Sequence, residues 1–183
     1  GAYKANRPIE LGKPVEWRSV PLKLRMPADW RNADARELAT DLFLKTPGVQ
    51  LIGGAVDPDA THRPRRVLVY LVTGGASDPA QLMADLLEVK VGRVRDEIVP
   101  ETIGPLPARE VILTGQFRRG LQKAIMRVAP LGDGRYVMLW MDCLGPPMPW
   151  ENRVFDTVAD SARLTDGDNG GDLPGHGISL GTQ

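Results

Sequence analysis

Residues 109–144, REVILTGQFRRGLQKAIMRVAPLGDGRYVMLWMDCL, decide the fold of this chain. The stretch opens with apolar and polar residues in alternation, and Val111, Leu113 and Phe117 share one side. A period of two is typical of a strand with one buried face. The polar run Arg118-Arg119-Gly120 then ends the pattern and favours a hairpin end.

Two more strands are predicted in the same stretch. Ala124, Met126 and Val128 share the better core face of the second strand. Asp133-Gly134 lies between two apolar runs and is a strong hairpin signal, because glycine accepts a positive φ without strain. Residues 136–143 are apolar on both sides almost throughout, which predicts a central strand covered on both faces. The stretch is therefore expected to form an antiparallel meander with a helix on at least one face.

Length and composition favour one soluble domain. A chain of 183 residues can bury one substantial core. Its 23 basic and 23 acidic residues balance, so nothing attracts it in bulk to nucleic acid or to an anionic membrane. No apolar run is long enough to span a bilayer. The single cysteine excludes an internal disulfide and a multi-cysteine zinc site.

The start of the chain suggests an exported protein. It begins Gly1-Ala2-Tyr3 without an initiator methionine, as chains do when an export or lipidation segment has been removed. We therefore expect an extracytoplasmic location, periplasmic or anchored to the envelope through an N-terminal lipid. A cytoplasmic location is the alternative.

The remaining elements are predicted from shorter patterns. Strands are expected at 15–26 (as one or two), at 49–56 (broken by Gly53-Gly54) and at 67–73. Residues 32–44 favour a short helix, with a strand at 38–44 as the alternative. Residues 95–108 are interpreted as a proline-rich connection into the meander.

Two helices complete the prediction. Ser77-Asp78-Pro79 supplies an N-cap followed by proline at the first helical position, and the helix should run to about residue 94. A terminal helix over 150–161 would bury Val154, Phe155 and Val158. The predicted organisation is an extended N-terminal segment (1–14), a single domain (15–164) and a flexible tail rich in glycine and aspartate (165–183).

The order of these elements, and the residues at which they end, resemble those of the PsbP-like superfamily. The resemblance rests on Pro27-x-x-Trp30, the Gly132-Asp133-Gly134 hairpin, the aromatic strand at 136–141, and a helix led by Trp150 that ends at Asp160-Ser161-Ala162-Arg163. The superfamily includes the extrinsic photosystem subunit, the Ran-binding import factor and DcrB-type bacterial lipoproteins.

The resemblance implies an α+β fold, an antiparallel sheet between helices in an α/β/α sandwich. It also implies a binding or assembly role without catalysis. The family commonly has Ser-Phe where this chain has Ser161-Ala162, and no family binding site can be matched to residues of this sequence.

One candidate site is the turn after the 67–73 strand. Gly74 and Gly75, with Ser77 at the start of the helix, could cradle a small anion, because free amides at a helix N-terminus attract phosphate. The turn lacks the dinucleotide fingerprint and the phosphate-loop lysine. A tight turn with an N-cap is the favoured interpretation.

Catalytic and metal sites have weaker patterns. Residues 166–172 resemble the start of a calcium loop, but glycines stand at two ligand positions, so an acidic tail is favoured and no metal is expected. Ser77 or Cys143 with His62 could form a hydrolase, although no Gly-x-Ser-x-Gly elbow is present and His176, the other histidine, lies in the polar tail. Neither a catalytic residue nor a cofactor is therefore predicted.

Arginines and tryptophans suggest binding surfaces instead. Arg63, Arg65 and Arg66 could join Arg118 and Arg119 in a basic patch if their loops converge, although solvated loop charges are the ordinary case.

Trp30 and Trp150 follow prolines at element boundaries, where they could line the rim of a groove. We expect a non-enzymatic module that recognises a protein partner through Trp30, Trp150 and the 145–149 loop with Pro147. The alternatives are small-molecule or anion binding at Gly74–Ser77 and, with least support, a hydrolase.

Overall fold

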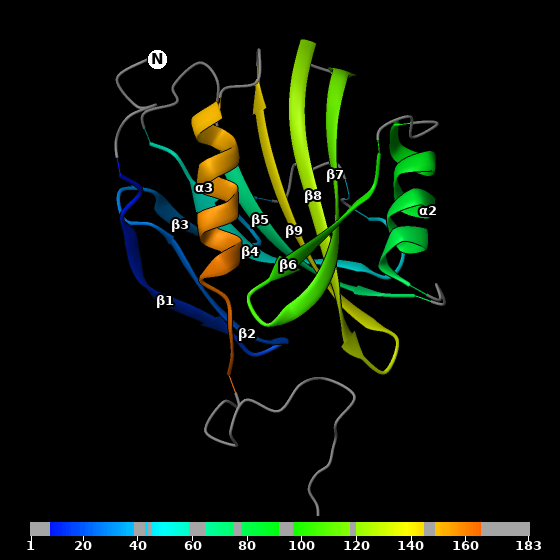
Figure 1. Cartoon of the computed structure of the whole chain (residues 1–183), viewed down its shortest axis with the longest axis horizontal. Helices are drawn as coiled ribbons and strands as arrows, with labels where there is room; N and C mark the ends of the chain where they lie inside the picture. Colours follow the sequence, from blue (N-terminus) through cyan, green and yellow to red (C-terminus); the bar gives the residue numbers. More distant parts are fainter. Residues whose placement is uncertain are drawn as a thin grey trace, which may run out of the picture.

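The computed structural model describes residues 8–38, 43, 45–58, 65–74, 78–91, 97–117, 120–144 and 149–165. This part of the chain forms two antiparallel sheets and two helices, so the predicted α+β class is confirmed (Figure 1). The strands are β1 (Leu11–Trp17), β2 (Val20–Pro27), β3 (Arg31–Asp34), β4 (Val49–Val56), β5 (Arg66–Thr73), β6 (Val99–Ile103), β7 (Leu106–Phe117), β8 (Gly120–Gly132), β9 (Arg135–Leu144) and β10 (Arg163–Leu164). The helices are α2 (Pro79–Val91) and α3 (Pro149–Asp160).

The predicted meander is the centre of the large sheet, whose strand order is β3-β4-β5-β9-β8-β7-β6. β7 pairs antiparallel with β8, and β8 pairs antiparallel with β9. β9 also pairs with β5, which makes it the middle strand of the seven. Its side chains from Tyr136 to Met141 are all buried. The expectation of a central strand covered on both faces is confirmed.

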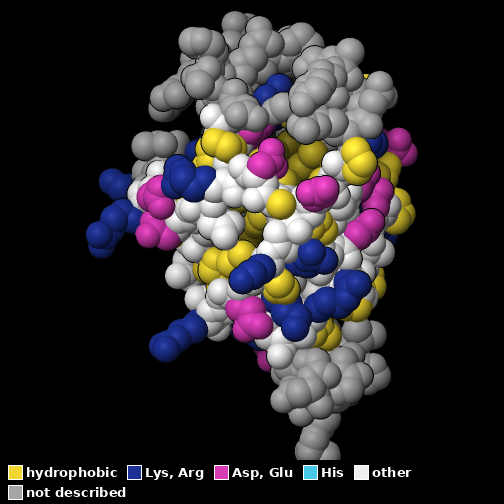
Figure 2. Space-filling view, turned by 90° about the vertical axis from the view of Figure 1, so that its left-hand side faces the viewer, with side chains coloured by type: hydrophobic (Ala, Val, Ile, Leu, Met, Phe, Trp, Pro, Cys, Tyr) yellow, Lys and Arg dark blue, Asp and Glu magenta, His cyan; other side chains and the backbone are white. Residues whose placement is uncertain are grey.

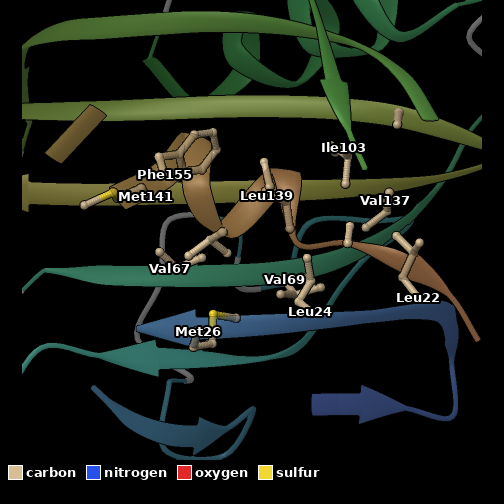
Figure 3. Packing of buried hydrophobic residues seen from close by; sticks show 14 of the residues in the cluster. Leu22, Leu24, Met26, Val67, Val69, Ile103, Val137, Leu139, Met141 and Phe155 are labelled. Carbon is tan, nitrogen blue, oxygen red and sulfur yellow. The ribbon is translucent and has the colours of Figure 1, made fainter. Parts of the chain in front are cut away.

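Two hydrophobic cores lie on opposite faces of the large sheet, and side chains alternate between them. Val137 and Leu139 of β9 face the core that lies under α3 and is closed by β2 (Figure 3). Met138 and Trp140 face the second core, which is covered by α2. Each strand of the meander thus contributes to both cores, as the period of two requires.

The second strand of the meander shows what the apolar pattern missed. Ala124, Met126 and Val128 are buried under α2, as predicted. The opposite face is buried as well, with Ile125 3% and Arg127 1% exposed. An arginine at such a position requires compensation, because an isolated buried charge is costly.

The strands predicted at 15–26 are present as β1 and β2, joined in a small sheet of order β1-β2-β10. β1 begins at Leu11, so residues 11–14 lie in the sheet. β10 pairs with the other edge of β2 and was not predicted, because two residues are too short to show a period.

The interpretation of residues 95–108 as a connection is wrong. They contain β6 and the start of β7, which form a hairpin around Gly104. Pro100 is compatible with β6 because this is an edge strand, paired with β7 alone. Gly104 has φ +56°, and a Cβ there would lie 2.2 Å from the carbonyl oxygen of Ala162. The hairpin therefore packs closely against the end of α3.

The helix expected from residue 32 is also wrong at its start. Arg31–Asp34 forms β3, which pairs antiparallel with β4. The chain then turns, and the N–H of Glu37 donates a hydrogen bond to Oδ1 of Asp34. Residues 39–42 and 44 of this prediction lie outside the described residues. Phe43 is described and packs edge-to-face on Trp140 at a ring-centroid distance of 5.2 Å.

Both predicted helices are present. Asp78 caps α2, since the N–H of Gln81 donates to its Oδ1 at 2.9 Å, and Pro79 is the first helical residue. α3 buries Val154, Phe155 and Val158, as expected. β4 runs continuously through the predicted break at Gly53-Gly54, with a register shift between Leu51 and Gly53.

Candidate functional site

A pocket of about 410 Å³ opens at the β1–β2 turn. Glu16, Trp17 and Arg18 line it from the turn, Arg135 lines it from the start of β9, and Thr165 lines it just after β10. Thr165 reaches the turn because β10 pairs with β2 beside it, whereas Arg135 comes from the large sheet. The pocket therefore exists only where the two sheets come together.

Trp17 forms the apolar wall of the pocket and is partly buried against the core under α3. Its indole crosses to the large sheet, where a Cβ added at Gly53 would lie 2.9 Å from its Nε1. Real Cβ atoms do not approach so closely, and any side chain at position 53 would displace the indole. Glycine on β4 thus allows the tryptophan to bridge the two sheets.

The pocket carries a net positive charge. Arg18 and Arg135 line it, and Glu16 is the acidic residue among its described lining. Within the part of the chain that the structure describes, neither arginine forms an ion pair with a carboxylate. Figure 2 shows the left-hand side of the molecule in Figure 1, where several Lys and Arg side chains lie in the lower half of the described surface. Two guanidinium groups are therefore available to an anionic ligand.

A second charged cluster surrounds the buried Arg127, and its groups pair with one another. The Arg127 guanidinium donates from Nε and Nη2 to Oε1 of Glu110, at 2.9 and 2.6 Å. Nη2 also donates to Oδ1 of Asp156 at 2.7 Å, and Nη1 donates to the carbonyl oxygen of Thr102 at 2.8 Å. The guanidinium carbon lies 5.1 Å from the centre of the Phe155 ring. This cluster ties α3 to β6, β7 and β8.

Burial and pairing act in opposite directions on the pKa values of this cluster. Burial is the larger effect at Glu110 and raises the pKa of its carboxyl, although the hydrogen bonds and charge of Arg127 lower it. At Arg127 burial lowers the pKa, but the hydrogen bonds to Glu110 and Asp156 and the charges of Glu110 and Glu101 outweigh it and raise the pKa. Arginine stays protonated at accessible pH. Glu110 is therefore the member of the pair that can change its charge.

A third cluster holds the start of α3. Nε of Arg65 donates to Oε2 of Glu151 at 2.7 Å, and its Nη1 lies 3.8 Å from Oδ2 of Asp57. The guanidinium carbon of Arg65 lies 4.7 Å from the centre of the Trp150 ring. Arg65 therefore has a structural role, while Arg63, Arg118 and Arg119 of the expected basic patch lie outside the described residues. Arg66 is the first residue of β5.

The tryptophans predicted as binding residues lie in the core. Trp30 is 8% exposed and Trp150 is 5% exposed, and both belong to the core under α3. An indole this deep offers a partner little surface. Pro147 and the rest of the 145–148 segment lie outside the described residues, so that part of the predicted contact stays a prediction.

The predicted anion turn is described only at Gly74. The N–H of Gly74 already donates to the carbonyl oxygen of Gly134 at 3.2 Å. The carboxylate of Asp78 caps α2, which places negative charge where an anion would bind. Gly75 and Ser77 lie outside the described residues.

The weaker candidates are placed only in part. His62, His176 and residues 166–172 lie outside the described residues, and Cys143 is described only as part of strand β9. Among the described residues, no three metal-binding side chains gather in one place. None of the described helices is both long and apolar enough to cross a membrane.

Neither the pocket nor the two ionic clusters is predicted by the sequence. Arg127 had a usable signal, since it interrupts an apolar strand face between Ile125 and Ala129. Arg18 and Arg135 had none, because each is an ordinary charged residue beside a turn. Only the tertiary structure brings them to one pocket.

The α+β fold of this chain resembles solved structures of PsbP-like proteins. The Ran-binding protein Mog1p of Saccharomyces cerevisiae superimposes with a TM-score of 0.55 at 12% identity, over 88% of this chain and 98% of Mog1p. The cyanobacterial PsbP protein CyanoP of Synechocystis gives a TM-score of 0.52 at 12% identity, over 87% of this chain and 95% of CyanoP. The resemblance predicted from the sequence is therefore confirmed for the fold.

A protein from Bacteroides thetaiotaomicron matches with a TM-score of 0.50 at 14% identity, over 84% of this chain. This chain spans about half of that protein, because the match covers 48% of it. No protein-family model matches the chain, and no curated protein sequence matches it. At these identities the likeness concerns the fold alone.

Proposed function

We propose that this chain is a non-enzymatic binding module that recognises a protein partner at the bacterial cell envelope. The observation that carries the proposal is the β1–β2 pocket, in which Arg18 and Arg135 lack a carboxylate partner among the described residues. Charged groups in an open pocket steer and select a partner of complementary charge. The fold is also compatible with this role, since Mog1p is a Ran-binding protein.

The proposal moves the recognition surface away from the two predicted tryptophans. Trp150 packs under Arg65 and closes the core at the start of α3. Substituting it would disturb the fold as well as any contact, so its loss could not identify a binding surface. Arg18 and Arg135 can be changed without opening the core. The 145–149 loop remains a second predicted contact.

The envelope location rests on the resemblance to DcrB-type lipoproteins. It requires a test of its own. Antibody detection of the native protein in membrane, periplasmic and cytoplasmic fractions checks it. A protein found only in the cytoplasmic fraction would refute this part of the proposal while leaving the binding role intact.

Affinity capture tests the binding role. The chain is immobilised and exposed to membrane and soluble fractions of its native organism, beside the double variant Arg18→Glu/Arg135→Glu. Lys13→Glu is the matched control, because Lys13 is an exposed residue of β1 that does not line the pocket.

A protein captured by the wild type and by Lys13→Glu, but lost with the double variant, supports recognition through the pocket. Equal capture by all three proteins would move the contact elsewhere on the surface. Reproducible capture of nothing from either fraction would contradict a protein partner.

A further inference from the structure

The charge of the β1–β2 pocket limits the ligands that it can accept. The two positive charges of Arg18 and Arg135 exceed the one negative charge of Glu16. A carboxylate or another anion is therefore attracted electrostatically into the pocket, and a cation is repelled. Guanidinium groups bind carboxylates through paired hydrogen bonds, which gives orientation as well as attraction. An acidic group is therefore the ligand chemistry that the pocket favours.

The wall formed by Trp17 adds a second requirement. The indole is partly buried, lines the pocket and packs so close to β4 that a Cβ at Gly53 would lie 2.9 Å from its Nε1. An aromatic surface of this kind favours contact with an apolar side chain, because the contact shields apolar area of both groups from water. An acidic residue beside an apolar residue satisfies both requirements.

The shape of the pocket favours a segment of a protein over a small molecule. Sites for small molecules bury most of the ligand surface, whereas this pocket lies open at a hairpin turn. Addition of a strand to the edge of β1 is disfavoured. Lys13 and Pro14 interrupt that edge, and Arg25 donates to the carbonyl oxygens of Leu11 and Gly12.

We infer that the β1–β2 pocket binds an acidic segment of the protein partner, whose carboxylate pairs with Arg18 and Arg135 while a neighbouring apolar side chain packs on Trp17. This inference rests on the proposed function and names the chemistry of the partner. The contact is made by side chains rather than by strand pairing. It weakens as salt concentration rises, because exposed charges are screened.

Fluorescence anisotropy with the full chain tests the inference. The probe is a labelled ten-residue peptide, Gly-Ser-Glu-Phe-Asp-Glu-Phe-Asp-Gly-Ser, and its control carries Gln and Asn in place of Glu and Asp. A third peptide keeps the acids and replaces Phe with Ser.

The acidic peptide is expected to bind at least about ten-fold more tightly than its amide control. Arg18→Gln and Arg135→Gln each weaken binding about five-fold, and Lys13→Gln leaves it unchanged. Replacing Phe with Ser weakens binding by a similar factor. Thermal unfolding of each variant confirms that it is folded.

Equal binding of the acidic and amide peptides would overturn the inference, and so would an acidic peptide that binds the Arg18→Gln/Arg135→Gln variant as tightly as the wild type. The capture experiment separates this failure from failure of the proposed function. One outcome is that capture identifies a partner that the pocket variant no longer binds, while the acidic and amide peptides bind equally. The proposed function would then be supported, and the inference of an acidic segment would be contradicted.

Discussion

Arg127 lies within β8, whereas the pocket arginines lie at a turn and at a strand start, and their surroundings are opposite. Arg127 is 1% exposed and donates to Glu110, Asp156 and a backbone carbonyl. Arg18 and Arg135 line an open pocket and have no carboxylate partner in the described chain. A buried guanidinium with every partner in place holds elements together, whereas an open one can bind something else. The contrast predicts that substitutions at the two places will affect different measurements.

The largest effect is expected from Arg127→Ala. Removing the guanidinium leaves the Glu110 carboxylate buried without its main partner, which should lower the free energy of unfolding by about 3–5 kcal/mol. Urea denaturation measures the change. The double variant Arg127→Met/Glu110→Gln should lose less, because it removes both charges together. A single variant as stable as the wild type would show that the cluster does not hold α3.

A pH series sharpens the account of Glu110. Burial raises the pKa of this carboxyl above its ordinary value of 4.5, so the folded state binds the proton more tightly than the unfolded state. The stability that this group contributes is then complete below pH 4.5 and decreases as pH rises through the folded pKa. Glu110→Gln cannot titrate and lacks this slope.

Urea denaturation of both proteins between pH 4 and pH 7 checks the sign. The wild type should lose stability relative to Glu110→Gln as pH increases. A wild type that instead gains relative stability would mean that pairing with Arg127 outweighs burial.

The position of Trp17 in the pocket wall can be changed without substituting a charged residue. Gly53→Ala places a Cβ where the Trp17 indole lies, so the indole should move at a cost of about 1 kcal/mol. Near-ultraviolet circular dichroism and affinity for the acidic peptide should both change. Gly12→Ala on β1 is the control, since a Cβ there meets no atom closer than 3.5 Å. Identical behaviour of the two variants would remove Trp17 from the binding argument.

The smallest effect on stability is expected in the pocket itself. Arg18→Glu and Arg135→Glu should change the free energy of unfolding by less than about 0.5 kcal/mol, because neither group pairs with a carboxylate among the described residues. Chemical denaturation beside the capture experiment makes the comparison with Arg127 direct. A loss as large as that of Arg127→Ala would show that these arginines have a structural role.

Much of the architecture was predictable, because the spacing of apolar residues or a turn residue indicated the element. The β7–β8–β9 meander followed from alternation and from the Asp133-Gly134 hairpin, and α2 followed from Asp78-Pro79. Short or exceptional elements were missed. β6 contains Pro100, which its edge position allows, and β10 has only two residues.

The candidate site was far less predictable than the fold. Trp30 and Trp150 were chosen because they follow prolines at boundaries, but their positions against the sheet bury them. The pattern of a sequence reports which residues share one face of one element. It does not report which elements meet, and a tryptophan at a boundary has the same pattern in a core as at a rim.

The sequence by itself determined the α+β class, the central strand and the two helices, because each leaves a local pattern of apolar residues and turn residues in the chain. The tertiary structure alone decided which arginine is buried in ion pairs and which arginines line an open pocket. Arg127 is matched by Glu110 and Asp156 from other elements, and Arg18 meets Arg135 only where the small sheet reaches the large one. Charge and burial at those points depend on distances across the fold, which the local order of residues does not contain.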